Sequence, residues 1–246
     1  MLTYHSITNI GGRETNEDCA LCVRRGETYC FAVADGLGGH ARGEDASRKF
    51  IEVVGREFEA GDLDETQPFL TKAFNAAQTE ILEMQNARGA KHEMKTTGVA
   101  LVVIGDKCAW AHCGDSRLYM FQKNKARART LDHSVPQMLA LAGSLKEKNI
   151  ARHPDRNRLL RVLGVEWDSP RFDVSDVYDV PPAQAFLLCT DGFWEFIEPK
   201  TMERCLKNSS GAEEWLSAMV SRVERNGAGF DMDNYTAVAV VARSNA

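Results

Sequence analysis

In the first third of the chain, the spacing of hydrophobic and polar residues changes from the period of β-strands to that of helices. Residues 18–25 and 29–35 have the composition of two strands, and Gly26 between them predicts a hairpin. Apolar residues then recur about every 3.6 positions through 43–60 and again through 68–86, the spacing of helices with one buried face. The pattern therefore predicts a hairpin followed by two amphipathic helices.

Strand patterns return after these helices. Residues 98–105, 107–113 and 116–122 are three short apolar runs, and a Gly-Asp pair separates each run from the next. Because the connections between them are so short, we expect the three strands to form an antiparallel meander.

The second half of the chain first changes character. Residues 133–170 are basic and loop-rich with helical stretches, which indicates an inserted lobe. Beyond it the pattern predicts strands at 172–177, 185–190 and 235–242, and a helix at 212–225. Groups of strands alternating with groups of helices predict an α+β fold with segregated layers. No repeat or Pro-rich linker divides residues 1–246, so we expect a single domain.

Composition and charge exclude several classes of function. The 246 residues are 43% hydrophobic and 26% charged, with a net charge of -5, so no global basic field attracts nucleic acid. A metal-dependent nuclease is therefore disfavoured. The sequence has no signal-peptide pattern and no apolar run long enough for a membrane span. We expect a cytoplasmic protein with no membrane insertion.

The seven cysteines are dispersed through predicted strands and one helix, which is typical of reduced, buried thiols. Cys19 and Cys22 form one C-x-x-C. A zinc or redox site is disfavoured there because no second pair exists and positions i and i+3 of a strand face opposite sides.

Five acidic residues, far apart in the sequence, each lie at a turn marked by glycine or asparagine. They are Asp18, Asp35, Asp115, Asp191 and Asp233. Carboxylates so far apart in sequence cooperate only if strands return their ends to one place, and clustered anions repel one another unless a cation is bound. Oxygen ligands without nitrogen or sulfur favour Mg²⁺ or Mn²⁺ over zinc. The sequence therefore predicts a hard-metal centre assembled by folding.

The segment DGLGGH shows how a glycine-rich turn serves such a centre. Asp35 ends a predicted strand, and the glycines after it allow the backbone carbonyl to approach an ion before the next helix begins. The same composition marks any tight turn, so the argument depends on the combination of motifs. For Asp115 the alternative is a turn aspartate that caps a strand.

The motifs RETNED, DGLGGH, TTG, GDSR, DHS, TDG and DN resemble, in order and spacing, those of the metal-dependent PP2C (PPM) Ser/Thr protein phosphatases. The resemblance covers nearly the whole chain, and the stretch GSLKEKNIARHPDRNRLLRVLG is similar to the flap of the bacterial branch. It implies an antiparallel β-sandwich flanked by α-helices, with the flap at about 133–170. It also implies two bound Mn²⁺ or Mg²⁺ ions and a weaker third.

The resemblance assigns ligands position by position. It makes Asp35 the bridging ligand, Gly36 a ligand through its carbonyl, Asp191 and Asp233 ligands of the second metal, Glu17 and Asp18 residues around the first, and Asp115 a ligand of the third. In this family the acid at the position of Glu17 usually acts through water.

Two further residues take part in the implied chemistry. Arg13 would grip the substrate phosphate, since a guanidinium matches two phosphate oxygens, although an early arginine is also a common surface residue. His40 would protonate the departing Ser or Thr oxygen, the alternative being a polar residue near a helix start. Arg117 and Thr97 are interpreted as structural, and no role is given to His5, His92, His112 or His153.

The resemblance implies a monomeric phosphatase that hydrolyses phosphoserine and phosphothreonine in proteins with a water activated by two metals. It would act opposite a bacterial eukaryotic-like Ser/Thr kinase, and DGFWEF at 191–196 is similar to phosphatases that accompany type VI secretion kinases. The alternatives are a partner-switching phosphatase for an anti-sigma antagonist and a non-catalytic phosphoprotein-binding relative. The basic stretch Arg152–Arg161 either docks acidic substrates or makes salt bridges to the body.

Overall fold

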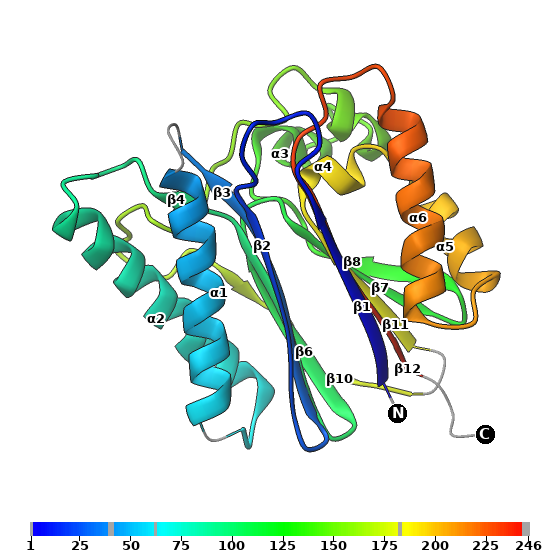
Figure 1. Cartoon of the computed structure of the whole chain (residues 1–246), viewed down its shortest axis with the longest axis horizontal. Coiled ribbons are helices and arrows are strands. Elements are labelled where there is room, and N and C mark those ends of the chain that lie inside the picture. The colour runs from blue at the N-terminus through cyan, green and yellow to red at the C-terminus, as the bar shows by residue number, and fades with distance from the viewer. Residues whose placement is uncertain (1, 39–41, 62, 182–183, 243–246) are drawn as a thin grey trace.

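Two antiparallel β-sheets face each other, and helices cover the outer side of each sheet (Figure 1). The computed structural model describes residues 2–38, 42–61, 63–181 and 184–242. One sheet has the order β1 (Leu2–Asn9), β12 (Tyr235–Ala242), β11 (Gln184–Cys189), β7 (Arg117–Gln122) and β8 (Lys125–Arg129). This confirms the α+β class and the sandwich.

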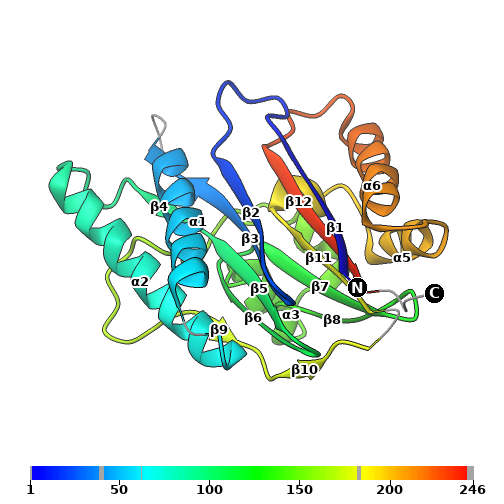
Figure 2. The ribbon, with the colours of Figure 1, turned by 60° about the horizontal axis from the view of Figure 1, so that its bottom comes forward.

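The second sheet carries most of the predicted early strands. Its order is β10 (Tyr178–Asp179), β6 (Lys107–Cys113), β5 (Gly98–Ile104), β3 (Thr28–Leu37) and β2 (Asp18–Arg25), with β4 (Lys95–Thr96) beside β3 and β9 (Asp173–Val174) beside β6. Figure 2 shows the strands of both sheets from a second side, between the pair α1 and α2 and the pair α5 and α6.

The helices divide between the two outer faces. Helices α1 (Arg42–Ala60) and α2 (Thr66–Ala87) cover the second sheet, whereas α5 (Pro199–Lys207) and α6 (Ala212–Gly227) cover the first. The short helix α4 (Asp191–Trp194) follows β11 directly. Helix α3 (Val135–Leu141) and a 3₁₀ turn at Glu147–Arg152 lie in the segment between β8 and β9.

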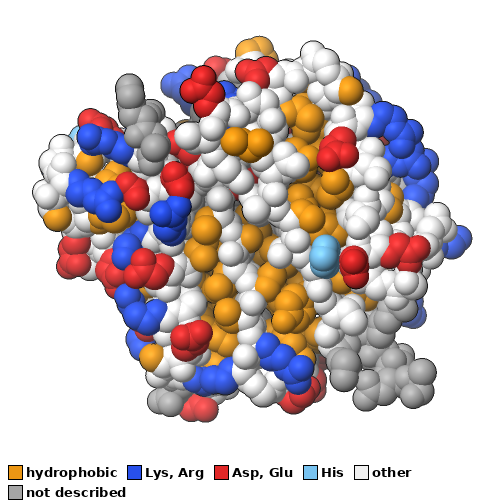
Figure 3. Space-filling view, viewed as in Figure 1, with side chains coloured by type: hydrophobic (Ala, Val, Ile, Leu, Met, Phe, Trp, Pro, Cys, Tyr) orange, Lys and Arg blue, Asp and Glu red, His pale blue; other side chains and the backbone are white. Residues whose placement is uncertain are grey.

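Alternation along β3 explains why the layers hold together. Phe31 and Val33 point into the core between the sheets, while Cys30, Ala32 and Ala34 contact the helical layer, as a period of two requires. Small residues on the helical side let α1 approach the sheet closely. Figure 3 shows hydrophobic side chains along the seam between the sheets.

The predicted meander is wrong in its third strand. Strands β5 and β6 pair as expected, but β7 belongs to the opposite sheet, where it pairs with β11 and β8. The chain crosses between sheets at Gly114, whose φ of +99° a residue with a side chain rarely adopts. The turn before Asp115 therefore joins two sheets instead of two neighbouring strands.

Other boundaries also differ from the sequence-based expectations. The predicted strand at 172–177 is replaced by the two-residue strands β9 and β10, and the segment 133–170 is mostly irregular, with one helix and one 3₁₀ turn. Strands β1 and β8 and helix α5 were not predicted. Cys19 packs against the helical layer and Cys22 against the inter-sheet core, so the two thiols face opposite sides of β2, as expected for positions i and i+3 of a strand.

Candidate metal centre

The first pair of predicted ligands lies at the ends of two neighbouring strands. Asp18 begins β2 and Asp35 lies near the end of β3, and the two residues are directly opposite in the antiparallel register. Thr97 fixes Asp35 from the other side: its Oγ1 accepts from the Asp35 amide at 3.0 Å, and its amide donates to the Asp35 carbonyl at 2.9 Å. Thr97 is thus structural, as predicted.

The opposite sheet supplies the second pair. Asp191 begins α4 immediately after β11, and Asp233 precedes β12. The Thr190 hydroxyl donates to Asp18 Oδ2 at 2.8 Å and so joins the ends of the two sheets. Four ligands predicted from distant motifs therefore meet at one edge of the sandwich.

Asp115 reaches the same place from the crossing turn after β6. Its side chain is buried, and its carbonyl accepts a hydrogen bond from Trp194 Nε1 at 3.0 Å. Burial first, and then the neighbouring Asp191 carboxylate, raise the pKa of Asp115 well above its ordinary value. Because Asp115 also acts on Asp35 electrostatically, it belongs to the cluster and is more than a strand cap.

Without a bound cation, the acidic cluster is destabilised by burial and by repulsion between its carboxylates. Burial raises the pKa of Asp18 to about 8, against hydrogen bonds from Thr190 and Thr236 that lower it. Burial and the charges of Asp191 and Asp18 raise the pKa of Asp35 well above its usual range, and burial with Asp233 raises that of Asp191 to about 6. Carboxyl groups that resist ionisation together are those that a divalent cation would stabilise.

The donor atoms fit a hard cation. Asp191 Oδ1 is buried and accepts no hydrogen bond from the described part of the chain. A buried oxygen without a hydrogen-bond partner is a suitable ligand for a cation. A Cβ on Gly36 would overlap the backbone carbonyl of Gly43, so the close approach of these two segments requires glycine at position 36. Carboxylates and carbonyls are the ligands that Mg²⁺ and Mn²⁺ prefer.

Glu17 lies between the cluster and the start of α1. Burial, followed by the charges of Asp233 and Glu44, raises the pKa of its half-buried carboxyl group. Its amide donates to Asn234 Oδ1 at 2.8 Å, and its carbonyl accepts from the Gly36 amide at 3.1 Å. The backbone of Glu17 therefore holds the loop in place, and its carboxylate lies on the rim.

Arg13 lies on the rim of the carboxylate cluster, where its guanidinium is paired with Asp233. Its Nε and Nη2 donate to the two carboxylate oxygens of Asp233 at 3.0 and 2.9 Å, and the charge of Asp233 raises the pKa of Arg13. The side chains are 46% and 40% exposed, so this bidentate pair is open to solvent. His40 lies outside the described residues.

Asn234 holds the loops of the site together, a role that the sequence reasoning missed. Its Nδ2 donates to the carbonyls of Ile10 and Thr15 at 2.8 and 2.9 Å, in addition to the bond from Glu17. It thereby ties the loop that carries Arg13 to the segment before β12 that carries Asp233. The DN motif was the available signal, but its asparagine was given no role.

Arginines around the centre are mostly structural. Arg117 donates to Asp132 at 2.8 and 2.6 Å and lies over the Trp194 ring at 3.5 Å, which confirms its structural interpretation. In the basic stretch, Arg156 pairs with Glu195 at 2.7 Å and Arg161 with Asp173 at 3.1 Å. Two of these arginines therefore make salt bridges to the body.

A carboxylate cluster between the ends of two sheets, with an arginine on its rim, is the arrangement that a metal-dependent hydrolase of an anionic substrate requires. Comparison with known proteins makes the class specific. The sequence profile described as Protein phosphatase 2C matches residues 9–235. The chain belongs to the protein phosphatase 2C family, whose members are protein serine/threonine phosphatases.

Individual relatives agree with this membership. Serine/threonine phosphatase stp of Listeria welshimeri is 29% identical over 214 residues, covering 85% of this chain and 82% of that protein. The catalytic domain of PstP, solved with two manganese ions, has a TM-score of 0.84 at 24% identity, covering 99% of each chain. PppA, described as a key regulatory component of T6SS in Pseudomonas aeruginosa, has a TM-score of 0.80 at 26% identity, covering 98% and 97%.

Among the described helices, none is both long and apolar enough to span a bilayer.

Proposed function

We propose that this chain hydrolyses phosphoserine and phosphothreonine esters of proteins, using two Mn²⁺ or Mg²⁺ ions held by the carboxylate cluster. The observation that supports this most is the convergence of buried carboxyl groups from both sheets, with Asp191 Oδ1 lacking a hydrogen-bond partner among the described residues. In the reaction, water and a phosphoester give phosphate and the free hydroxyl of serine or threonine.

The residues divide this work. When bound, two hard divalent cations lower the pKa of water and neutralise the phosphoryl oxygens. Asp35 would be shared by both ions, the Gly36 carbonyl would be a further ligand, Asp191 and Asp233 would hold the second ion, and Asp18 and Glu17 would serve the first. Asp115 would hold a weaker third ion.

Arg13 is the proposed phosphate-binding residue. A guanidinium that already makes a bidentate contact with the Asp233 carboxylate has the geometry to make the same contact with two phosphate oxygens. Its exposed position allows it to turn from one to the other. His40 remains our proposed proton donor to the departing oxygen.

We further propose the biological setting. The phosphatase would act as a cytoplasmic monomer opposite a Ser/Thr kinase, and the seven unpaired cysteines agree with a reducing compartment. Its 26% identity with PppA over nearly all of both chains supports a role in type VI secretion. Residues 1–246 would form one domain, with 133–170 as its flap.

The test is phosphate release from a phosphothreonine peptide and from an aryl phosphate, with Mn²⁺, Mg²⁺ or chelator. We expect release that requires metal and that Asp191→Asn reduces at least about 100-fold, since several kcal/mol of transition-state stabilisation depend on the centre. Asp168→Asn, at an exposed position, is the matched control and should leave turnover unchanged. Equal turnover in native protein and Asp191→Asn would refute the proposal, and metal binding without any turnover would favour the phosphoprotein-binding alternative.

A further inference from the structure

His133 holds the turn that carries Asp115 by two hydrogen bonds. The His133 amide donates to the Gly114 carbonyl at 2.9 Å, and the Gly114 amide donates to His133 Nδ1 at 3.2 Å. Gly114 is the left-handed residue where the chain crosses between the sheets, and a Cβ there would lie 2.6 Å from Thr97 Cγ2. Both backbone polar groups of Gly114, the residue before Asp115, are therefore engaged by one residue.

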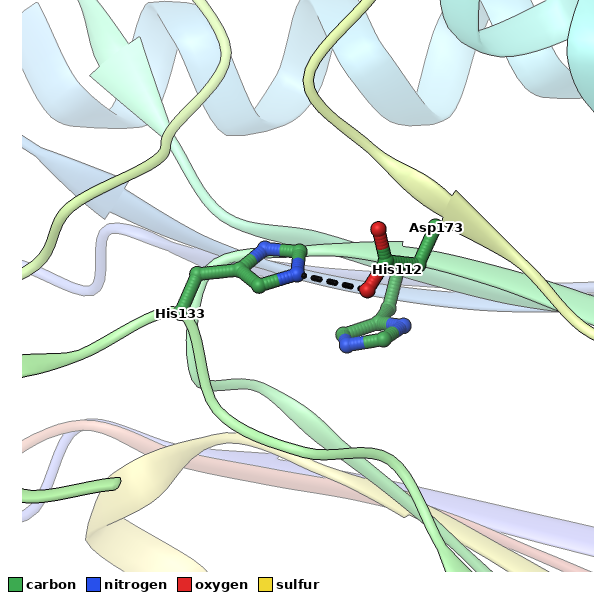
Figure 4. A group of neighbouring side chains, drawn as sticks. All are labelled: His112, His133 and Asp173. Carbon is green, nitrogen blue, oxygen red and sulfur yellow. Dashed lines mark hydrogen bonds and ion pairs between the residues drawn. The ribbon is translucent and has the colours of Figure 1, made fainter. Parts of the chain in front are cut away.

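The imidazole of His133 is in turn anchored. Because Nδ1 accepts a hydrogen bond, the ring proton is on Nε2, which donates to Asp173 Oδ2 at 3.1 Å (Figure 4). The ring is buried, and burial lowers the pKa of His133, so the neutral form required by these bonds is favoured. Asp173 also accepts from Nη1 of Arg161, a residue within the segment 133–170, at 3.1 Å.

The cluster resembles a metal site, but its hydrogen bonds indicate otherwise. Ligand atoms of His112, His133 and Asp173 lie within 4.8 Å of one another. However, both nitrogens of His133 are engaged, His112 Nε2 contacts the Leu131 carbonyl at 2.9 Å, and the Arg161 guanidinium brings a positive charge to Asp173. The two imidazole rings stack, with centroids 4.6 Å apart, instead of converging on an ion.

The side of Asp115 away from Gly114 is also fixed. Its carbonyl accepts from Trp194 Nε1, and the hydroxyl of the next residue, Ser116, contacts Thr97 Oγ1 at 2.7 Å. The backbone of Asp115 is thus held from both directions. Of these contacts, only that of His133, the first residue of the segment 133–170, is linked through Asp173 to Arg161 further along the same segment.

We propose that His133 is a positioning residue that directs the Asp115 carboxylate toward Asp35 and Asp191 and connects this orientation to Arg161 of the flap segment through Asp173. The inference rests on the proposed function, in which Asp115 binds the weaker third cation. His133 touches neither metal nor substrate, and its effect on the reaction is exerted through the Gly114 peptide.

Two histidine variants separate positioning from general stability. His133→Asn keeps an acceptor, Oδ1, where Nδ1 lies, but loses the contact with Asp173. His133→Phe loses both contacts. Because removing a residue that orients a ligand typically costs 10- to 100-fold in metal affinity, we expect His133→Phe to weaken the third Mn²⁺ site at least about tenfold. The two tight sites should remain, and His133→Asn should stay within a few-fold of the native affinity.

A second pair tests the link to the flap segment without altering the histidine. Asp173→Asn keeps an acceptor for the Nε2 proton, whereas Asp173→Ala removes it. We expect Asp173→Ala to weaken the third site several-fold and Asp173→Asn to leave it within about twofold. This pair also serves if His133→Phe does not fold.

The readout is calorimetric Mn²⁺ binding to the full chain, with Asp115→Asn as the reference for loss of the third site and melting temperature as the stability measure. Equal third-site affinity in native protein and His133→Phe would overturn the inference. It would also be overturned if His133→Asn weakened the third site as much as His133→Phe, and Asp173→Asn as much as Asp173→Ala. A native chain with two sites alone would also overturn it and leave the proposed function intact. A native chain that binds no Mn²⁺ would overturn both.

Discussion

Replacing Asp18 by asparagine should stabilise the metal-free protein while weakening its response to metal. The Asp18 carboxyl group is buried, with Oδ2 accepting from the Thr190 hydroxyl, and asparagine offers an equivalent oxygen at that position. Burial raises the pKa of this group from 3.8 to about 8. The native chain therefore bears a cost at neutral pH that the amide does not.

The size and sign of the effect follow from this pKa. A folded-state pKa above the unfolded value means that stability is complete below about pH 4 and declines as pH rises toward about 8. A pH of 7.5 is about 3.7 units above the ordinary pKa of 3.8. At ~1.36 kcal/mol per unit, the upper limit of the loss in unfolding free energy is therefore about 5 kcal/mol. Sharing of protons with Asp35 and relaxation of the site reduce this to about 2–3 kcal/mol, or roughly 5–10 °C in Tm.

The assay is urea unfolding in chelator at pH 7.5 and pH 5, comparing the native chain, Asp18→Asn and the exposed control Asp106→Asn. We expect the advantage of Asp18→Asn to fall below about 1 kcal/mol at pH 5, where the native carboxyl group is largely protonated. Saturating Mn²⁺ should then stabilise the native chain more than the variant. An advantage of the same size at both pH values, or no advantage at pH 7.5, would refute the electrostatic reasoning.

Three other substitutions test separate parts of the site. Arg117→Met leaves Asp132 buried without its bidentate partner and should cost about 3–5 kcal/mol in urea unfolding, whereas Arg127→Met, at an exposed position, should cost under about 0.5 kcal/mol. Gly36→Ala should lower Mn²⁺ affinity in calorimetry at least about tenfold because its Cβ overlaps the Gly43 carbonyl, while Gly211→Ala, whose Cβ meets open space, should leave affinity unchanged. Arg13→Ala should raise the KM for a phosphothreonine peptide about tenfold. Its Mn²⁺ affinity should be unchanged or higher, because Asp233 loses the guanidinium that competes with the metal. An unchanged KM would show that Arg13 does not bind the phosphate.

The clustered carboxylates of the site were predictable because each has a local signal. Asp35, Asp191 and Asp233 lie at strand boundaries beside glycine or asparagine, and strand ends of a sandwich meet at its edges. The roles of Asn234 and His133 could not be predicted, since these residues make hydrogen bonds to backbone atoms of residues that only folding brings near. Their motifs were visible, but their partners were not.

The fold was predictable in its elements and less so in their pairing. Periodicity identified β6 and β7 but does not determine which sheet a strand joins, and the crossing at Gly114 depends on packing against Thr97. Strand β1 was missed because its half-exposed edge position gives only a weak hydrophobic alternation. The short strands β9 and β10 depend on pairing with β6, which is a contact between distant parts of the chain.

Anomalous diffraction from crystals of the protein soaked in Mn²⁺ tests the central claim most directly. Two strong manganese peaks should lie between the carboxylates of Asp18, Asp35, Asp191 and Asp233, with the Arg13 guanidinium displaced from Asp233. The same experiment on Asp191→Asn should lose at least one of these peaks. No manganese at the carboxylates, or a principal peak at His112, His133 and Asp173 instead, would contradict the account.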